Sequence, residues 1–149
     1  MIINYLWLPI LFVIHDFEEI ILVPTWLALH RKEIAFKKRP PFGGISNSSI
    51  LSIGVLEELL LLVGVSLYSS CTHSNSLYFY VTIAYTIHLV LHLFICFQYH
   101  GYVPGIVTAI IQLPFLFVCI YQLFLILNPS LFSLFFHSLV LVCVLLLNV

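Results

Sequence analysis

Long runs of apolar residues, separated by short polar segments, form the pattern of this chain. A helix that crosses a bilayer needs roughly 20 predominantly apolar residues, and five runs come close to that length. The polar segments contain turn-forming residues, such as Pro-Pro-Phe-Gly-Gly at 40–44 and Asn128-Pro129. The pattern predicts an all-α, polytopic helical bundle with about five transmembrane helices, over residues 4–29, 49–70, 77–98, 103–127 and 131–148.

The composition agrees with a membrane protein. Of the 149 residues, 62% are hydrophobic and only 7% are charged, whereas a soluble domain carries about a quarter charged residues. The length leaves room for one helical unit, so we expect a single transmembrane domain over residues 1–149. The opening segment lacks a basic region, and acids follow where a signal-peptide cleavage site would fall, so a cleaved signal peptide is not expected.

The basic residues predict how the chain is oriented in the membrane. All five lie in one segment, residues 30–48, and short loops rich in Lys and Arg stay on the cytoplasmic side. We therefore expect a multi-pass protein of the cell membrane with the N-terminus outside and the C-terminus cytoplasmic. The segment could instead bind anionic lipid or nucleic acid. Membrane topology already explains the cluster of basic residues, however, so no nucleic-acid partner is expected. The basic residues are Arg31, Lys32, Lys37, Lys38 and Arg39.

Ionisable side chains inside the predicted spans are the feature that points to function. Five of the six acids and four of the seven histidines fall there, although each charged group at that depth costs roughly 2.5–3.5 kcal/mol. No Lys or Arg lies in the spans, so protons, histidines or a metal cation must neutralise the acids. The acids are Asp16, Glu18, Glu19, Glu57 and Glu58, and the histidines are His15, His88, His92 and His137.

Helical phase brings some of these groups onto shared faces. At about 100° per residue, His15 and Glu19 are about 40° apart, and His88 and His92 form a second pair at the same spacing. Two side chains at positions i and i+4 can chelate one metal ion. Asp16 points about 100° away from His15 and is expected to face elsewhere.

The polar groups of the first three spans also lie at a similar depth, which predicts one buried site. We expect His15, Glu19, Glu58, His88 and His92 to be metal ligands. By analogy with the His-x-x-Glu-His zinc motif, Glu18 is a candidate general base. Glu57 is a second candidate for a catalytic role, and the sequence does not decide whether Glu57 or Glu58 faces the site.

Two further polar residues near this site have open roles. Tyr85 lies one turn before His88, so its hydroxyl is expected either to bond to the site or simply to pack in the core. Gln112 in the fourth predicted span could reach the same polar region.

Together these residues resemble the HXXEE-motif family of small bacterial integral membrane proteins. The motif is His15-Asp16-Phe17-Glu18-Glu19, and the likeness continues through "VLEELL", "HLVLH" and "YVPGIVTAIIQLP", covering most of residues 10–115. The resemblance implies an integral membrane domain with a metal or catalytic centre, and it supplies no reaction. The chain departs from the expected pattern at His100-Gly101, where a basic residue would precede the Tyr-x-Pro-Gly segment.

Histidine and carboxylate donors without thiolates suit zinc, with iron and manganese as alternatives, in a mononuclear or dinuclear centre. The leading hypothesis is a metal-dependent hydrolase acting on a lipidic substrate or a membrane peptide. The alternatives are a di-iron-type membrane oxidoreductase, a proton or metal transporter, and a non-catalytic membrane partner or immunity-type protein in which the polar cluster only holds helices together.

Overall fold

The computed structural model describes residues 4–34, 42 and 47–147, with side chains up to Cys143 in the last helix. The described part is all-helical and contains no strand, which confirms the predicted fold class. It contains six helices: α1 (Trp7–Leu29), α2 (Arg31–Ile34), α3 (Ser48–Thr72), α4 (Asn75–Tyr99), α5 (Ile106–Leu127) and α6 (Leu131–Leu147).

Three of these helices, α3, α4 and α5, are long and apolar enough to cross a membrane, so this is a membrane protein. The five predicted spans correspond to the five long helices, but α1 carries three acids and α6 has only 17 residues. The helix bounds lie within three residues of the predicted ones. In the basic segment 30–48, Arg31 and Lys32 lie in α2, whereas Lys37, Lys38 and Arg39 lie outside the described residues.

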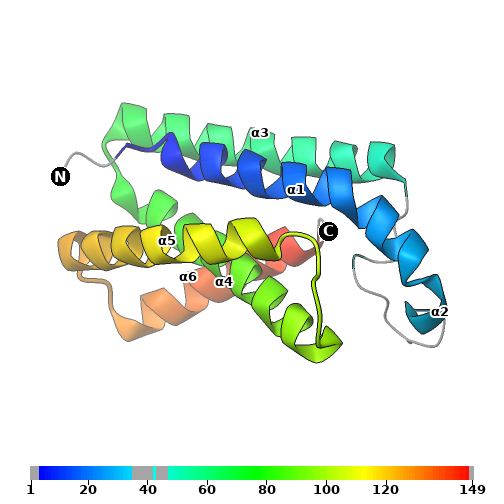
Figure 1. Ribbon diagram of the computed structural model, residues 1–149. Coiled ribbons are helices and arrows are strands. Elements are labelled where there is room, and N and C mark those ends of the chain that lie inside the picture. The colour runs from blue at the N-terminus through cyan, green and yellow to red at the C-terminus, as the bar shows by residue number, and fades with distance from the viewer. Residues whose placement is uncertain (1–3, 35–41, 43–46, 148–149) are drawn as a thin grey trace.

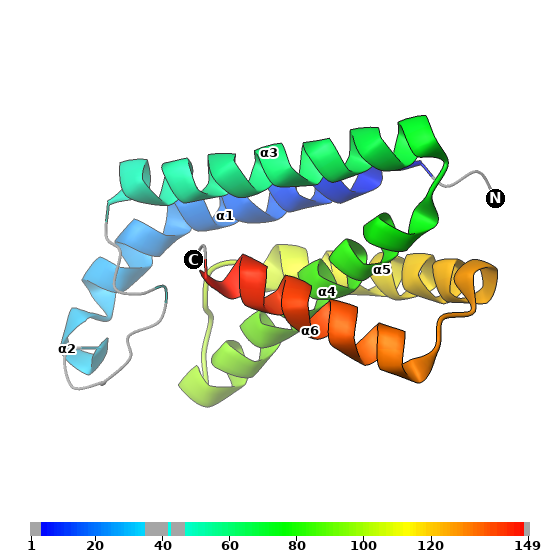
Figure 2. The same ribbon diagram turned by 180° about the vertical axis from the view of Figure 1, so that it is seen from behind.

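The long helices form two groups that meet at the centre of the molecule. In both views α1 and α3 lie side by side and run in opposite directions, with α2 at one end of the pair (Figures 1 and 2). Helix α4 packs against α3, α5 and α6, and α1 packs against α3 and α5. Side chains of α1 and α4 also meet in the middle of the bundle, as the rings of Phe12 and Tyr85 do.

Local contacts fix how α1 and α3 pair. The side chain of Asn47 accepts a hydrogen bond from the Ser49 N–H at 2.9 Å and so caps the start of α3. Pro24 lies inside α1 and has no N–H to donate to the carbonyl of Ile20. The hydroxyl of Ser48 donates to that carbonyl at 3.5 Å, which connects the first turn of α3 to α1.

The core and the surface are both apolar, as expected for a protein that faces lipid on the outside. Leu8, Phe12, Phe79 and Leu89 are at most 2% exposed and belong to one buried cluster shared by α1 and α4. Many large apolar side chains are exposed, for example Phe17, Leu60 and Phe117, and a bilayer would cover them at no cost.

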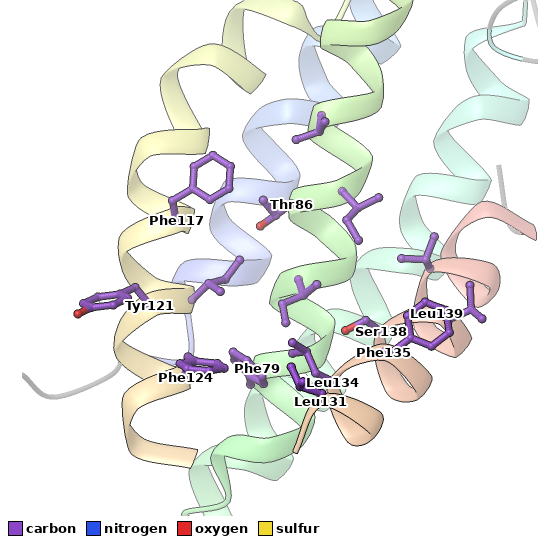
Figure 3. Close-up of a pocket in the computed structure, with 15 residues that line it drawn as sticks. Phe79, Thr86, Phe117, Tyr121, Phe124, Leu131, Leu134, Phe135, Ser138 and Leu139 are labelled. Carbon is purple, nitrogen blue, oxygen red and sulfur yellow. The ribbon is translucent and has the colours of Figure 1, made fainter. Parts of the chain in front are cut away.

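An apolar groove of about 880 Å³ runs between α4, α5 and α6 (Figure 3). The labelled side chains that surround it are almost all hydrocarbon, with Thr86 and Ser138 as small polar exceptions and the Tyr121 hydroxyl at the edge. None of the ionisable residues singled out in the sequence lines this groove.

Candidate metal centre

Four ionisable side chains from α1 and α4 meet in the centre of the bundle. His15 and Glu19 come from α1, and His88 and His92 come from α4. One donor atom from each residue lies within 4.8 Å of the other three. Each pair is spaced i and i+4, so each helix presents two donors on one face, and the packing of the bundle brings the two faces together.

The distances between donor atoms fit a single metal ion. The Nε2 atom of His92 lies 3.0 Å from Oε1 of Glu19 and 3.3 Å from Nε2 of His88. The Nε2 atom of His15 lies 3.8 Å from the same Glu19 oxygen. Ligands at 2.0–2.1 Å from a tetrahedral zinc ion are roughly 3.3–3.4 Å from one another. The observed spacings bracket this value.

A hydrogen-bonded chain fixes the tautomer of His15. The Thr108 hydroxyl lies 2.6 Å from Oε2 of Glu18 and 2.8 Å from Nδ1 of His15. The Gly105 carbonyl, 3.2 Å away, is a second possible acceptor for the Thr108 hydroxyl. Because a carboxylate is the stronger acceptor, the hydroxyl donates its hydrogen bond to Glu18. The Thr108 oxygen then accepts from the His15 Nδ1–H, which leaves a lone pair on Nε2 that faces the other three residues.

His92 is oriented in the same way by a backbone carbonyl. Its Nδ1 lies 3.2 Å from the carbonyl oxygen of Pro104, which can only accept, so Nδ1 carries the proton and Nε2 the lone pair. The buried atoms His15 Nε2 and Glu19 Oε1 have no hydrogen-bond partner. Acceptor atoms that face one another at this distance need a cation or an added proton between them. The donor set therefore fits a metal ion.

Gly105 allows the segment between α4 and α5 to approach this cluster. A Cβ atom at this position would lie 2.8 Å from Oε1 of Glu19, 2.8 Å from Nδ1 of His92 and 3.0 Å from Cε1 of His15. The residue also has φ +86°, which other residues rarely adopt. This conformation is the reason why α5 begins at Ile106, whereas the sequence predicted a start at 103.

Glu18 lies behind His15 rather than among the four donors. Its Oε2 accepts hydrogen bonds from the Thr108 N–H at 2.9 Å and from the Thr108 hydroxyl, and its Oε1 accepts from the Tyr102 hydroxyl at 3.0 Å. Partial burial and the hydrogen bond to Glu18 raise the pKa of Tyr102 to about 12, so Tyr102 keeps its proton at neutral pH. The Trp26 indole N–H donates to the Tyr102 carbonyl at 2.8 Å and fixes this loop on α1.

The two adjacent glutamates of α3 have different environments in the structure. Glu58 is buried with 6% exposure and lines a cavity together with Glu19 and His88, although it is not one of the four clustered donors. Glu57 is exposed, because consecutive helix residues point about 100° apart. The structure therefore does not bring Glu57, predicted as a catalytic carboxylate, to the site.

Several contributing residues were missed or misplaced by the sequence. Asp16, expected to face elsewhere, is 5% exposed and lines the same cavity as Glu58. Thr108 was not predicted to belong to the site, although a hydroxyl one turn after the Pro-Gly segment was a usable signal. The Tyr85 hydroxyl donates to Gln112 Oε1 at 2.7 Å, and Gln112 Nε2 donates to the Leu11 carbonyl at 3.0 Å. These two residues therefore connect α4, α5 and α1 beside the cluster.

Comparison with known proteins agrees with the motif. A family model described as a protein of unknown function with an HXXEE motif matches residues 6–121. The matched region begins before α1 and ends inside α5, so it contains the four clustered donors and Thr108. No curated protein and no solved structure matches the chain.

Proposed function

This chain belongs to the HXXEE family, and from that premise we propose that it is a metal-dependent membrane hydrolase that acts on a lipidic or membrane-embedded substrate. The observation that supports the proposal best is that the buried acceptor atoms His15 Nε2 and Glu19 Oε1 have no hydrogen-bond partner, although they lie 3.8 Å apart and His92 Nε2 lies 3.0 Å from the same Glu19 oxygen. Such a set is stable when a divalent cation occupies it.

The donor types favour zinc, with iron and manganese as alternatives. Imidazole and carboxylate without a thiolate suit all three metals. Catalytic zinc takes three protein ligands and keeps one open position. His15, Glu19 and His92 supply three donors, and His88, whose Nε2 lies 3.3 Å from that of His92, is either the fourth ligand or a neighbour of the open position. A single ion accounts for the observed group of four, so we favour a mononuclear centre.

Each residue has a distinct task in this proposal. His15, His92 and Glu19 would hold the ion, because Nε2 of each histidine lies within 3.8 Å of Glu19 Oε1. A bound divalent ion supplies a Lewis acid that polarises a carbonyl group and activates water. Glu18 accepts three hydrogen bonds, so we assign it the orientation of His15 through Thr108 rather than the role of base. Glu58 borders the cavity beside the cluster and takes the role of general base.

We also propose an orientation in the cell membrane. The basic segment 30–48 lies on the cytoplasmic side, which places the N-terminus outside and the C-terminus in the cytoplasm. The cavity beside the cluster is lined by the first two turns of α3, so substrate would enter from the leaflet next to that segment.

Replacing Thr108 by valine should lower metal affinity about 10- to 100-fold, the usual effect of losing a partner that orients a metal-binding histidine. Valine keeps the volume of threonine but cannot bridge Glu18 and His15. Competition with a chromophoric chelator measures the affinity. Thr82→Val is the matched control, because the buried Thr82 hydroxyl donates only to its own helix at Tyr78. Equal affinities in the two variants would refute the orienting role of Thr108.

Substitution of the two glutamates of α3 tests the proposed hydrolase activity. Membranes containing the protein are incubated with a panel of lipid esters and amides, and products are identified by mass spectrometry. We expect Glu58→Gln to lose turnover while keeping its metal, and Glu57→Gln to keep both, since Glu57 is exposed away from the site. Undiminished turnover by Glu58→Gln would contradict the assignment of the base.

A further inference from the structure

A cavity of about 250 Å³ lies beside the metal cluster, between α1 and α3. Two of the four clustered residues, Glu19 and His88, belong to its wall. Two more acids, Asp16 and Glu58, complete the polar part of that wall. The remaining lining is apolar and comes from Phe42 and from the start of α3, at Ile50, Leu51, Ile53, Gly54 and Val55.

Each of the two additional acids has a buried carboxyl oxygen without a partner among the residues that the structure describes. Asp16 is 5% exposed and Glu58 is 6% exposed. Within the described residues, no hydrogen bond or ion pair reaches Oδ2 of Asp16 or Oε1 of Glu58. Nearly all buried polar groups in folded proteins are satisfied, so two unpartnered carboxyl oxygens in one cavity point to a hydrogen-bonding group that the described residues do not supply.

The shape and the lining define what this ligand must be. A carboxyl group offers an acceptor oxygen whether or not it carries a proton, so a group that carries N–H or O–H is its complement. The apolar wall requires a hydrocarbon part, and the volume is below the usual range of about 300–1,000 Å³ for ligand pockets, which suits one narrow chain. Because Glu19 and His88 share the wall, the head group of such a ligand would lie next to the metal position.

We propose that this cavity is the substrate chamber, and that Asp16 and Glu58 bind the head group of a single-chain amphiphile through its N–H or O–H groups. The proposal rests on the hydrolase function proposed above and names its substrate class. The hydrocarbon chain would lie along the apolar wall at the start of α3, and the head group would lie between the carboxyl groups and the metal cluster.

Photo-crosslinking in lipid nanodiscs tests the chemistry of the head group. Three diazirine probes of equal chain length are used with metal-loaded protein: a primary amine, an alcohol and a trimethylammonium salt. The amine and the alcohol should label residues 50–55 of α3, with about ten-fold less labelling by the trimethylammonium probe, which lacks a donor. Equal labelling by all three probes, or labelling outside this segment, would overturn the proposal.

Two pairs of variants locate the chamber and test its carboxyl group. Gly54→Leu adds a side chain to the lining, and Glu58→Leu removes an acceptor, so both should lose amine labelling about ten-fold. Their controls are Gly64→Leu, at an exposed position of the same helix with nothing within 4 Å of an added Cβ, and Glu57→Leu, at the exposed neighbour. Labelling that survives in both test variants would refute the chamber.

Metal content is measured on the same samples, which separates this proposal from the one it rests on. Protein that binds metal but shows no donor-dependent labelling would refute the chamber and leave the metal centre in place. Protein that shows donor-dependent labelling but binds no metal would refute the hydrolase and support the recognition of the head group by Asp16 and Glu58.

Discussion

Protein in which His92 is replaced by alanine should be purified without bound metal. The Nε2 atom of His92 lies 3.0 Å from Glu19 Oε1 and 3.3 Å from His88 Nε2, so its removal breaks both of these close donor pairs. The loss of a direct ligand should exceed the roughly 100-fold upper effect of losing an orienting partner. Affinity is measured by chelator competition after loading with zinc, iron(II) or manganese.

His137→Ala is the matched control for this change. His137 is also a helix histidine, but it lies in α6 and its Nδ1 contacts Ser133 of its own helix. The control should bind metal as the unchanged protein does. Unaltered metal affinity in His92→Ala would mean that these four side chains do not form the site.

Gly105→Ala should have the second-largest effect, even though it adds a single methyl group. That group would lie 2.8 Å from both Glu19 Oε1 and His92 Nδ1, and the backbone at φ +86° disfavours any residue with a Cβ. We expect loss of bound metal and a decrease in unfolding free energy of about 1–3 kcal/mol, the usual cost of a strained backbone conformation. Metal analysis and thermal unfolding in detergent measure the two effects.

Two other glycines, Gly64 and Gly101, supply the comparison. An added Cβ at Gly64 meets nothing within 4 Å, and at Gly101 the nearest atom is the Tyr99 carbonyl oxygen at 3.9 Å. Alanine at either position should leave metal content unchanged. If Gly105→Ala binds metal as tightly as these two controls, the close approach of the Pro-Gly segment to the cluster is unimportant for the site.

The pairs within each helix could be predicted from the sequence because helical geometry alone determines them. His15 with Glu19, and His88 with His92, share a face whatever the rest of the chain does, and the cost of burying them predicts that they meet. The structure brings both pairs together. The all-helical fold followed in the same way from the length of the apolar runs.

The choice between Glu57 and Glu58 could not be predicted, because it depends on how α3 is rotated against α1. A rotation of one residue position would exchange the buried and the exposed glutamate. The cavity position of Asp16 was not predicted, for a related reason. It does point away from His15 along α1, but α3 packs on that side, so Asp16 faces a cavity next to the cluster.

The role of Glu18 depends on a contact that spans 90 residues of sequence. Analogy with a zinc motif suggested that Glu18 is a general base. In the structure, Thr108 of α5 donates two hydrogen bonds to Glu18 and connects it to His15. In this account the three named positions of the HXXEE motif have two tasks. His15 and Glu19 would hold the metal ion, and Glu18 keeps His15, through Thr108, in the tautomer that could bind it.

The most direct measurement is the metal content of the purified protein, determined by mass spectrometry after loading with zinc, iron(II) or manganese and removal of free ions. We predict about one ion per chain in the unchanged protein, as for a mononuclear site, and none in the double variant His15→Ala/His92→Ala. Unchanged protein that binds none of the three metals, or a double variant that binds as much as the unchanged protein, would contradict the metal centre.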